Sequence, residues 1–291
     1  MPFKPKALAS ATVFIAAAGL SACATQMQPS LSLDQIASIE VTTGDQLEFI
    51  PLNPARGDAS PQAGVLWGDI REDVPSGVLL RFADGFSSPP HIHNITYRAV
   101  VIDGAIHNDD PDAAKMWMGP GSFWTQPAGE IHITAGQPGA SATAFLEILE
   151  GPYLVQPGEK AFDNGEQPLN LTQANMVWLG PDEMTWIKTG GDASPSIAQL
   201  WGAPDAGALS GSLYKVPAGF SGQFKAEGAS FRAVVVDGAL SHGVTGATET
   251  VTLERGAYFA SDAGVSHDVV CDADVQCLVY VRSTGRVEIT G

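Results

Sequence analysis

The chain has few basic side chains. Among its 291 residues, 15 are lysine or arginine and 32 are aspartate or glutamate, which gives a formal net charge of −17 at pH 7. Proteins that bind nucleic acids need lysine and arginine to neutralise phosphates, and an acidic surface repels the phosphate backbone. We therefore expect no nucleic acid partner.

Motifs of several common enzyme classes are missing as well. The sequence contains no glycine-rich phosphate loop, no G-x-S-x-G nucleophile elbow and no H-E-x-x-H zinc motif. Long apolar runs are scarce too. The one at residues 7–20 has about 14 residues, whereas a membrane-spanning helix needs ~20. Any chemistry must come from other residues.

Cysteine is also rare, and the first of only three, Cys23, ends a segment that looks like an export signal. Lys4 and Lys6 precede the apolar run, and Leu20-Ser21-Ala22-Cys23 resembles a bacterial lipoprotein cleavage box. We predict that residues 1–23 are a lipoprotein signal peptide and that Cys23 carries the lipid. The alternative is an ordinary secretory signal with an incidental cysteine.

The residues after Cys23 bear on where the protein is delivered. Ala24 follows the cysteine, and the absence of aspartate there favours the outer membrane. Residues 24–38 are polar and are expected to form a tether. The sequence thus predicts an exported protein, held by its lipid anchor at the periplasmic side of the bacterial envelope.

The other two cysteines, Cys271 and Cys277, flank a turn at residues 272–274. Apolar, β-rich runs on both sides of this turn predict a hairpin. An exported protein meets an oxidising compartment, so a disulfide is one expectation. Two free thiols are the other, because disulfide geometry is demanding.

An internal repeat organises the rest of the chain. Leu-Trp-Gly at 66–68 recurs at 200–202, and YRAVVIDGA at 97–105 recurs as FRAVVVDGA at 231–239, both with an offset of 134 residues. A single gene duplication explains this better than a solenoid, whose repeats are ~20 to 50 residues long.

Each half contains short Val-, Ile- and aromatic-rich runs broken by Gly, Pro, Asn and Asp, and no convincing helical period. We therefore predict an all-β protein of two tandem jelly-roll barrels. The expected limits are 39–151 for the first barrel, 152–172 for a linker and 173–291 for the second barrel.

A histidine pattern marks the first half. The spacing G-x5-H-x-H-x3-Y-x6-G contains His91, His93 and Tyr97, and G-x5-P-x-G-x2-H ends at His132. Alternate residues of a strand point to the same face, so His91 and His93 can both reach one cavity. With His132 from a neighbouring strand they would supply three nitrogen ligands and leave other positions of a metal open.

These two motifs resemble the signatures of the cupin superfamily, and the whole chain resembles an uncharacterised bacterial two-cupin (bicupin) family. The resemblance implies two tandem cupin barrels, the jelly roll also called a double-stranded β-helix. Cupins usually carry a glutamate where this chain has Tyr97, so it also implies a site of three histidines without a carboxylate. Three-histidine cupins are known among thiol and diketone dioxygenases.

The second half is expected to have lost this site. The repeat offset is 134 residues up to Tyr97 and rises to 135 by His132. At these offsets the positions of His91, His93, Tyr97, Glu130 and His132 are occupied by Lys225, Glu227, Phe231, Val265 and His267. Lys225 and Glu227 are expected either to satisfy each other beside His267 or to face solvent.

Tyr97 and Glu130 are the candidate catalytic residues. The Tyr97 hydroxyl is expected to donate a hydrogen bond to a bound substrate, with metal ligation or simple packing as alternatives. Glu130 stands two residues before His132 and would act as an acid or base or orient a ligand imidazole, unless it is a rim carboxylate in solvent. His107 and His242 fall just beyond turns and are expected to be exposed.

The predicted cofactor is one divalent transition metal ion per chain, because imidazole suits Fe, Zn, Mn, Ni and Cu alike. The sequence therefore favours an exported metal-dependent oxidoreductase, similar to a dioxygenase, that acts on a small organic molecule. The alternative is a non-catalytic cupin lipoprotein that binds a small ligand or senses metal or oxidant. Assembly into a homo-oligomer stays open.

Overall fold

The computed structural model describes residues 38–190, 193–204, 207–262 and 264–291. The predicted signal peptide and all but the last residue of the predicted tether lie outside these ranges. Within them, no helix is both long and apolar enough to cross a membrane.

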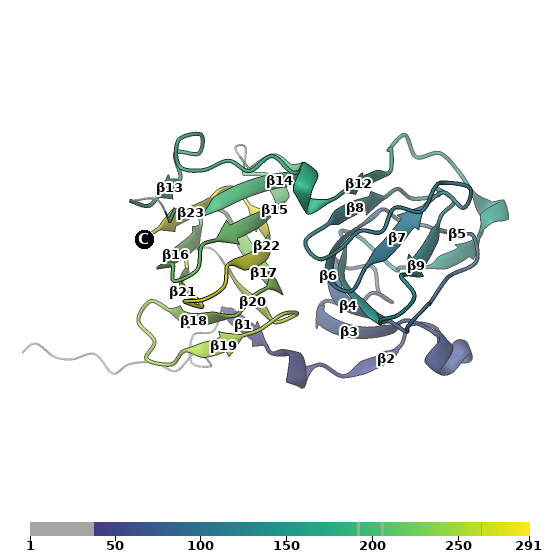
Figure 1. Cartoon of the computed structure of the whole chain (residues 1–291), viewed down its shortest axis with the longest axis horizontal. Coiled ribbons are helices and arrows are strands. Elements are labelled where there is room, and N and C mark those ends of the chain that lie inside the picture. The colour runs from purple at the N-terminus through teal and green to yellow at the C-terminus, as the bar shows by residue number, and fades with distance from the viewer. Residues whose placement is uncertain (1–37, 191–192, 205–206, 263) are drawn as a thin grey trace, which may run out of the picture. The chain divides into compact units, whose positions relative to one another are not determined.

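The described chain consists mainly of strands (Figure 1). Its first part contains β1 (Ile39–Thr42), η2 (Gly44–Gln46), β2 (Phe49–Pro51), η3 (Pro54–Ala59), β3 (Gln62–Trp67), β4 (Ser76–Phe82), β5 (His91–His93), β6 (Tyr97–Asp103), β7 (Ile106–Asp109), β8 (Phe123–Gln126), β9 (Ile133–Gly136), β10 (Ala142–Ile148), β11 (Val155–Pro157), η4 (Gly158–Lys160), β12 (Leu169–Leu171) and η5 (Gln173–Asn175). Its second part contains β13 (Ile187–Lys188), β14 (Ser196–Gly202), β15 (Leu209–Val216), β16 (Ser221–Ala226), β17 (Ser230–Asp237), β18 (Leu240–Val244), β19 (Val251–Leu253), β20 (Tyr258–Asp262), β21 (Ser266–Cys271), β22 (Cys277–Thr284) and β23 (Val287–Thr290).

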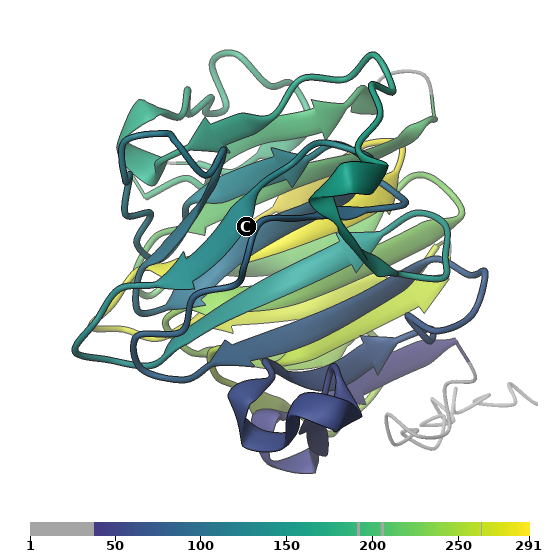
Figure 2. The same cartoon turned by 90° about the vertical axis from the view of Figure 1, so that its right-hand side faces the viewer.

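These strands form two jelly-roll barrels, which confirms the predicted all-β fold. In the first barrel a sheet with the order β12-β8-β6-β10-β4-β3-β2 is completed by the pairs β11-β5 and β7-β9. In the second barrel the sheets have the orders β1-β20-β17-β22-β15-β14 and β13-β23-β16-β21-β18-β19. The short helix η3 lies beside the strands of the first barrel (Figure 2).

Burial on both faces explains the unbroken apolar runs of β6 and β17. In β6, Tyr97, Ala99 and Val101 face the interior of the first barrel, while Val100 and Ile102 belong to a cluster shared with the second barrel. The corresponding run of β17 divides between two clusters in the same way. A strand buried on both faces has no solvent side, so the polar alternation of a surface strand disappears.

The cluster between the barrels contains a buried carboxylate. Trp67 stacks on Tyr258 with ring centroids 5.1 Å apart, and Phe145 and Tyr280 also lie 5.1 Å apart. Beside them, Glu147 accepts a hydrogen bond from the Tyr280 hydroxyl. Burial raises the pKa of Glu147, although the nearby guanidinium of Arg282 opposes this shift.

Two edge strands lie outside the predicted limits of the barrels that they complete. β1, which the sequence assigned to the first barrel, pairs antiparallel with β20 of the second. β12, which falls in the predicted linker, pairs antiparallel with β8 of the first barrel. The large sheet of each barrel therefore ends in a strand from outside the predicted limits of that barrel.

Cys271 and Cys277 are joined by a disulfide between β21 and β22. Their Cα atoms lie 5.9 Å apart, within the range that a disulfide bridges. Of the two expectations for these cysteines, the structure has the disulfide.

Candidate metal centre

The three predicted histidine ligands lie together inside the first barrel. His91 and His93 come from β5, and His132 stands next to β9. The backbones of His91 and His132 are joined by two hydrogen bonds of 3.1 and 3.0 Å, which bring the third imidazole to the first two. The side chains are at most 8% exposed, and one ligand atom from each lies within 4.8 Å of the others.

Backbone carbonyls fix the orientation of all three rings. The Nδ1 atoms of His91, His93 and His132 lie 2.9, 3.1 and 3.1 Å from the carbonyl oxygens of Pro89, Leu154 and Glu130. A carbonyl oxygen only accepts hydrogen bonds, so each Nδ1 must carry the proton. Each Nε2 is then left with a lone pair, the arrangement that metal-binding histidines usually show.

Electrostatics keep these imidazoles neutral. Burial lowers the pKa of His91, His93 and His132, and for His132 the value falls to about 3. The Nε2 atoms of His91 and His93 nevertheless lie only 3.2 Å apart. Two lone pairs this close need a cation or a proton between them, and the low pKa values disfavour a proton. The donor set therefore fits a divalent transition metal.

Tyr97 lies beside this centre in a network of neutral side chains. Its hydroxyl donates to Asn108 Oδ1 at 2.9 Å and is 3.5 Å from His132 Nε2. Asn108 in turn donates to Gln126 Oε1 at 2.8 Å. Burial raises the pKa of Tyr97 to about 12, so the phenol is neutral in the absence of metal.

The structure adds Tyr153, which sequence reasoning missed. Its hydroxyl lies 3.1 Å from His93 Nε2, and its ring stacks on His93 with centroids 4.2 Å apart. Tyr153 falls in the predicted linker and outside both histidine motifs. A lone tyrosine in a Pro- and Gly-rich segment gives no signal that the chain returns to the barrel there.

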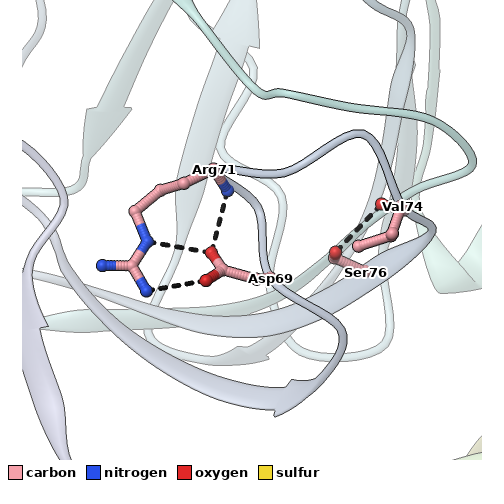
Figure 3. A network of polar contacts seen from close by, with 4 residues as sticks. All are labelled: Asp69, Arg71, Val74 and Ser76. Atoms are coloured by element: carbon pink, nitrogen blue, oxygen red, sulfur yellow. Dashed lines mark hydrogen bonds and ion pairs between the residues drawn. The ribbon is translucent and has the colours of Figure 1, made fainter.

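The loop between β3 and β4 contacts the segment that contains Tyr153 and holds it at the barrel. Arg71 donates to both carboxylate oxygens of Asp69, as Figure 3 shows, and the hydrogen bonds lower the pKa of Asp69 to about 2. In the same loop, Ser76 Oγ donates to the Val74 carbonyl at 3.1 Å. Between Asp69 and Arg71, the carbonyl of Ile70 accepts the backbone N–H of Tyr153 at 2.7 Å.

His91 and His93 open onto a cavity of about 140 Å³. His91, His93, Tyr97 and Tyr153 all contribute to its lining. Most of the remaining wall is apolar and comes from Leu52, Pro61, Leu80, Phe82, Phe86, Trp124, Ala144, Leu146 and Val155. Among the described residues of the lining, Arg56, on η3, is the only one with a charged side chain.

Glu130 is not part of this lining. Its side chain is exposed, and only its backbone carbonyl reaches the site, where it accepts hydrogen bonds from His132 Nδ1 and from Gln126 Nε2. The position agrees with a rim carboxylate rather than with the acid or base role expected for Glu130. The two-residue spacing to His132 did not bring the Glu130 side chain inward, because Glu130 directly follows the turn at residues 128–129 and precedes β9, outside any strand.

His107 and His242 are buried, so the expectation that they are exposed was wrong. They do lie just beyond the turns, but within strands β7 and β18, where they are buried. The His107 ring packs near Trp117 and its Nδ1 accepts the Met116 N–H at 3.3 Å. His242 Nε2 lies 2.9 Å from His267 Nδ1 inside the second barrel.

In β16 of the second barrel, the residues that face the interior differ from those expected from the repeat. His91 forms a bridge with His132, and in β16 the residue opposite His267 is Phe224, not Lys225. Phe224 is fully buried, whereas Lys225 and Glu227 are exposed. The matches of Lys225 to His91 and of Glu227 to His93 were therefore wrong by one residue, and a phenylalanine ring fills the matching position.

Among the residues that the structure describes, the only group of three or more potential metal ligands is the one in the first barrel. The second barrel keeps a buried polar chain instead. His267 Nδ1 lies 2.9 Å from His242, and its Nε2 lies 2.8 Å from Ser261 Oγ.

Comparison with solved structures identifies the fold. A candidate dioxygenase from Nostoc punctiforme has a TM-score of 0.63 at 14% identity, over 85% of this chain and 83% of that one. Salicylate 1,2-dioxygenase from Pseudaminobacter salicylatoxidans has a TM-score of 0.56 at 14% identity, over 90% and 91%. Oxalate decarboxylase from Lactobacillus farciminis has a TM-score of 0.55 at 10% identity, over 86% and 87%. At such identities the likeness shows the cupin fold alone.

Comparison with curated proteins finds no match. The model of a protein family, the domain of unknown function DUF4437, matches residues 40–290. This match spans both barrels and nearly all of the described residues. The chain therefore belongs to the DUF4437 family, folded as two tandem cupin barrels, the first of which holds three buried histidines that could bind a metal ion.

Proposed function

We propose that this protein is an exported, metal-dependent oxidoreductase of the dioxygenase type that acts on a small organic molecule. The observation that carries the proposal is the convergence of three buried Nε2 lone pairs, from His91, His93 and His132, beside an apolar cavity. Two of the similar structures are described as dioxygenases, which supports the same class of reaction.

The chemistry follows from the charges of the donors. A divalent metal held by neutral imidazoles keeps its full positive charge and open positions, so it can bind and polarise an anionic or chelating substrate and, if redox-active, exchange electrons with it. The protein residues supply the rest. The apolar walls exclude water. The Tyr97 hydroxyl lines the cavity and donates to Asn108 Oδ1, so donation to a bound molecule would replace that hydrogen bond.

The cavity also limits the substrate. An apolar cavity of about 150 Å³ accommodates benzene, so the volume of about 140 Å³ suits a single ring. Aromatic side chains in the lining favour a flat molecule. Arg56 has no ion pair with any residue of the described chain, and its guanidinium would complement a carboxylate or enolate. We infer a one-ring, singly charged anion as the preferred class.

Oxygen uptake tests this function. The iron-loaded protein would be offered one-ring aromatic acids and phenols, small diketones and thiols, with larger flavonols as a size control. We expect uptake with the one-ring anions and a loss of affinity for them, but not for their neutral amides, in Arg56→Gln. The absence of turnover, together with tight retention of an unaltered small molecule by the zinc-loaded protein, would favour the binding-protein alternative.

Export by a lipid anchor is the second part of the proposal, and it rests on the sequence around Cys23. Cys23→Ser is expected to stop lipid attachment and to release the protein from the membrane fraction, because the acylated side chain would be missing. Mass spectrometry of the mature N-terminus measures this directly. An unmodified N-terminus in the wild-type membrane fraction would contradict the anchor and leave the metal centre unaffected.

A further inference from the structure

Tyr153 has the spacing of a metal ligand. Its hydroxyl oxygen lies 3.1 Å from His93 Nε2, and the Nε2 atoms of His91 and His93 are 3.2 Å apart. Two atoms that each lie ~2.1 Å from one ion are separated by about 3.0 to 3.4 Å at the usual bond angles. We propose that the phenolic oxygen of Tyr153 is a fourth protein ligand of the metal, an inference that rests on the metal centre of the proposed function.

If Tyr153 did not bind the metal, metal binding to His93 would leave the Tyr153 hydroxyl without a hydrogen-bonding partner. Within the described chain, the only hydrogen-bonding partner of the Tyr153 hydroxyl is His93 Nε2. His93 Nδ1 donates to the Leu154 carbonyl, so Nε2 carries the lone pair that a metal would take. A hydroxyl that loses its acceptor in a desolvated site destabilises the complex. Binding the same metal compensates for that loss.

The backbone holds Tyr153 together with the histidine ligands. The side chain of Asn94, the residue after His93, donates from Nδ2 to the Pro152 carbonyl at 2.9 Å and accepts the Leu154 N–H at Oδ1 at 2.8 Å. These two hydrogen bonds lie on either side of Tyr153. The carbonyl of Ile70, in the loop of Figure 3, accepts the Tyr153 N–H. The phenol is therefore positioned before a metal arrives, as a ligand should be.

Tyr97 provides the contrast within the same cavity. It stands where cupins usually carry a carboxylate, but its hydroxyl donates to Asn108 Oδ1 at 2.9 Å. This hydrogen bond does not involve a ligand nitrogen, so a metal would not remove it. Tyr97→Phe is therefore a matched control for Tyr153→Phe: each change removes one buried phenolic oxygen near the histidines.

The binding step is a proton exchange without electron transfer. The Tyr153 O–H bond breaks, the proton passes to solvent, and the phenolate oxygen forms a bond to the metal. The charge of the centre falls from 2+ to 1+. A metal that accepts six ligands would keep two positions for substrate, whereas a four-coordinate ion would keep none.

Cu(II) is a suitable probe, because it binds imidazole strongly and its phenolate complexes absorb intensely in the visible. We would titrate the metal-free full chain with Cu(II), record visible spectra and measure bound copper by elemental analysis. We expect one Cu(II) per chain and a phenolate-to-copper band in the wild type and in Tyr97→Phe. In Tyr153→Phe the copper should remain bound and the band should disappear.

A band that survives in Tyr153→Phe, or wild-type protein that binds Cu(II) without a band, would overturn the ligand assignment while leaving the metal centre intact. Failure of the wild type to bind Cu(II) would overturn both. If Tyr153→Phe does not fold, resonance Raman spectra of Tyr97→Phe decide the question. Phenolate vibrations there support Tyr153, the other tyrosine of the cavity, and their absence contradicts it.

Discussion

The two barrels share a strand arrangement and differ in the side chains at matching positions of their interiors. Where His91 faces His132 in the first barrel, Phe224 faces His267 in the second. Asn108 and Thr134 are cross-strand partners in the first barrel, as His242 and Val269 are in the second. The second barrel thus closes around a phenylalanine ring and a histidine pair, and its described residues contain no group of three potential metal ligands. The fold does not require the three-histidine site, so that site is better explained by function than by stability.

The sharpest test of this comparison is the number of metal ions per chain. We expect one in the wild type, none in His132→Ala and one in His267→Ala, because His267 belongs to no group of three potential metal ligands among the described residues. Elemental analysis of protein dialysed against excess metal gives these numbers. Two ions in the wild type would show that the second barrel still binds metal.

Phe224→Ala should affect stability most, because it removes a fully buried ring from the second barrel. We expect the free energy of unfolding to fall by about 3 to 5 kcal/mol, as is usual when a buried phenylalanine leaves a cavity. Urea unfolding of the metal-free protein measures the change. Lys225→Ala is the control, since this neighbour is exposed. Equal effects of the two substitutions would contradict the register of β16.

Tyr97→Phe should separate chemistry from metal binding in the first barrel. We expect the metal content to stay the same and turnover to fall by roughly ten- to a thousandfold, the range for loss of one positioned hydrogen-bond donor. Steady-state oxygen uptake and elemental analysis would be measured on the same samples. Tyr214→Phe removes a buried phenol from the second barrel and should leave turnover unchanged. A loss of metal in Tyr97→Phe would instead favour ligation by Tyr97.

Acid should destabilise the second barrel through its histidine pair. Burial lowers the pKa of His242 to about 4 and of His267 to about 3, whereas an unfolded histidine titrates near 6.5. Below pH 6.5 the unfolded chain therefore binds more protons. The neutral histidines therefore contribute fully to the free energy of unfolding above pH 6.5. As the pH falls toward 4, this contribution decreases by about 1 kcal/mol per histidine per pH unit.

The matched variant for this pH effect is His242→Asn, which places in the second barrel the residue that Asn108 provides in the first. Unfolding midpoints of the metal-free protein between pH 8 and pH 5 should decline less steeply in His242→Asn than in the wild type. Parallel pH profiles would show that His242 does not contribute to the acid sensitivity.

The fold and the grouping of the three histidines could be predicted from the sequence, because the signals for both are local. The two-residue spacing of His91 and His93 and the glycine-anchored motif before His132 are local signals, and the structure brings these residues together. Tyr153 could not be predicted, because a segment with the composition of a linker returns to the site through contacts with Asn94 and Ile70.

The error in β16 has a different cause. Gly85 and Gly219 both have positive φ and match at the repeat offset. From there the second half is one residue shorter before Phe224 and one residue longer before Phe231, so the offset is restored further along. Two compensating changes in length are invisible to an alignment at constant offset, and each side chain of β16 was assigned to the opposite face.

The edge strands β1 and β12, which lie outside the predicted limits of the barrels that they complete, restrict how this architecture can change in evolution. A cut at the start of the predicted linker, after residue 151, would separate β12 from β8, its partner in the first barrel, and would separate β1 from β20. Each fragment would expose an unpaired edge at its large sheet, a surface prone to aggregation. The duplication is therefore difficult to reverse: descendants can vary what each barrel contains, but not easily return to a single barrel.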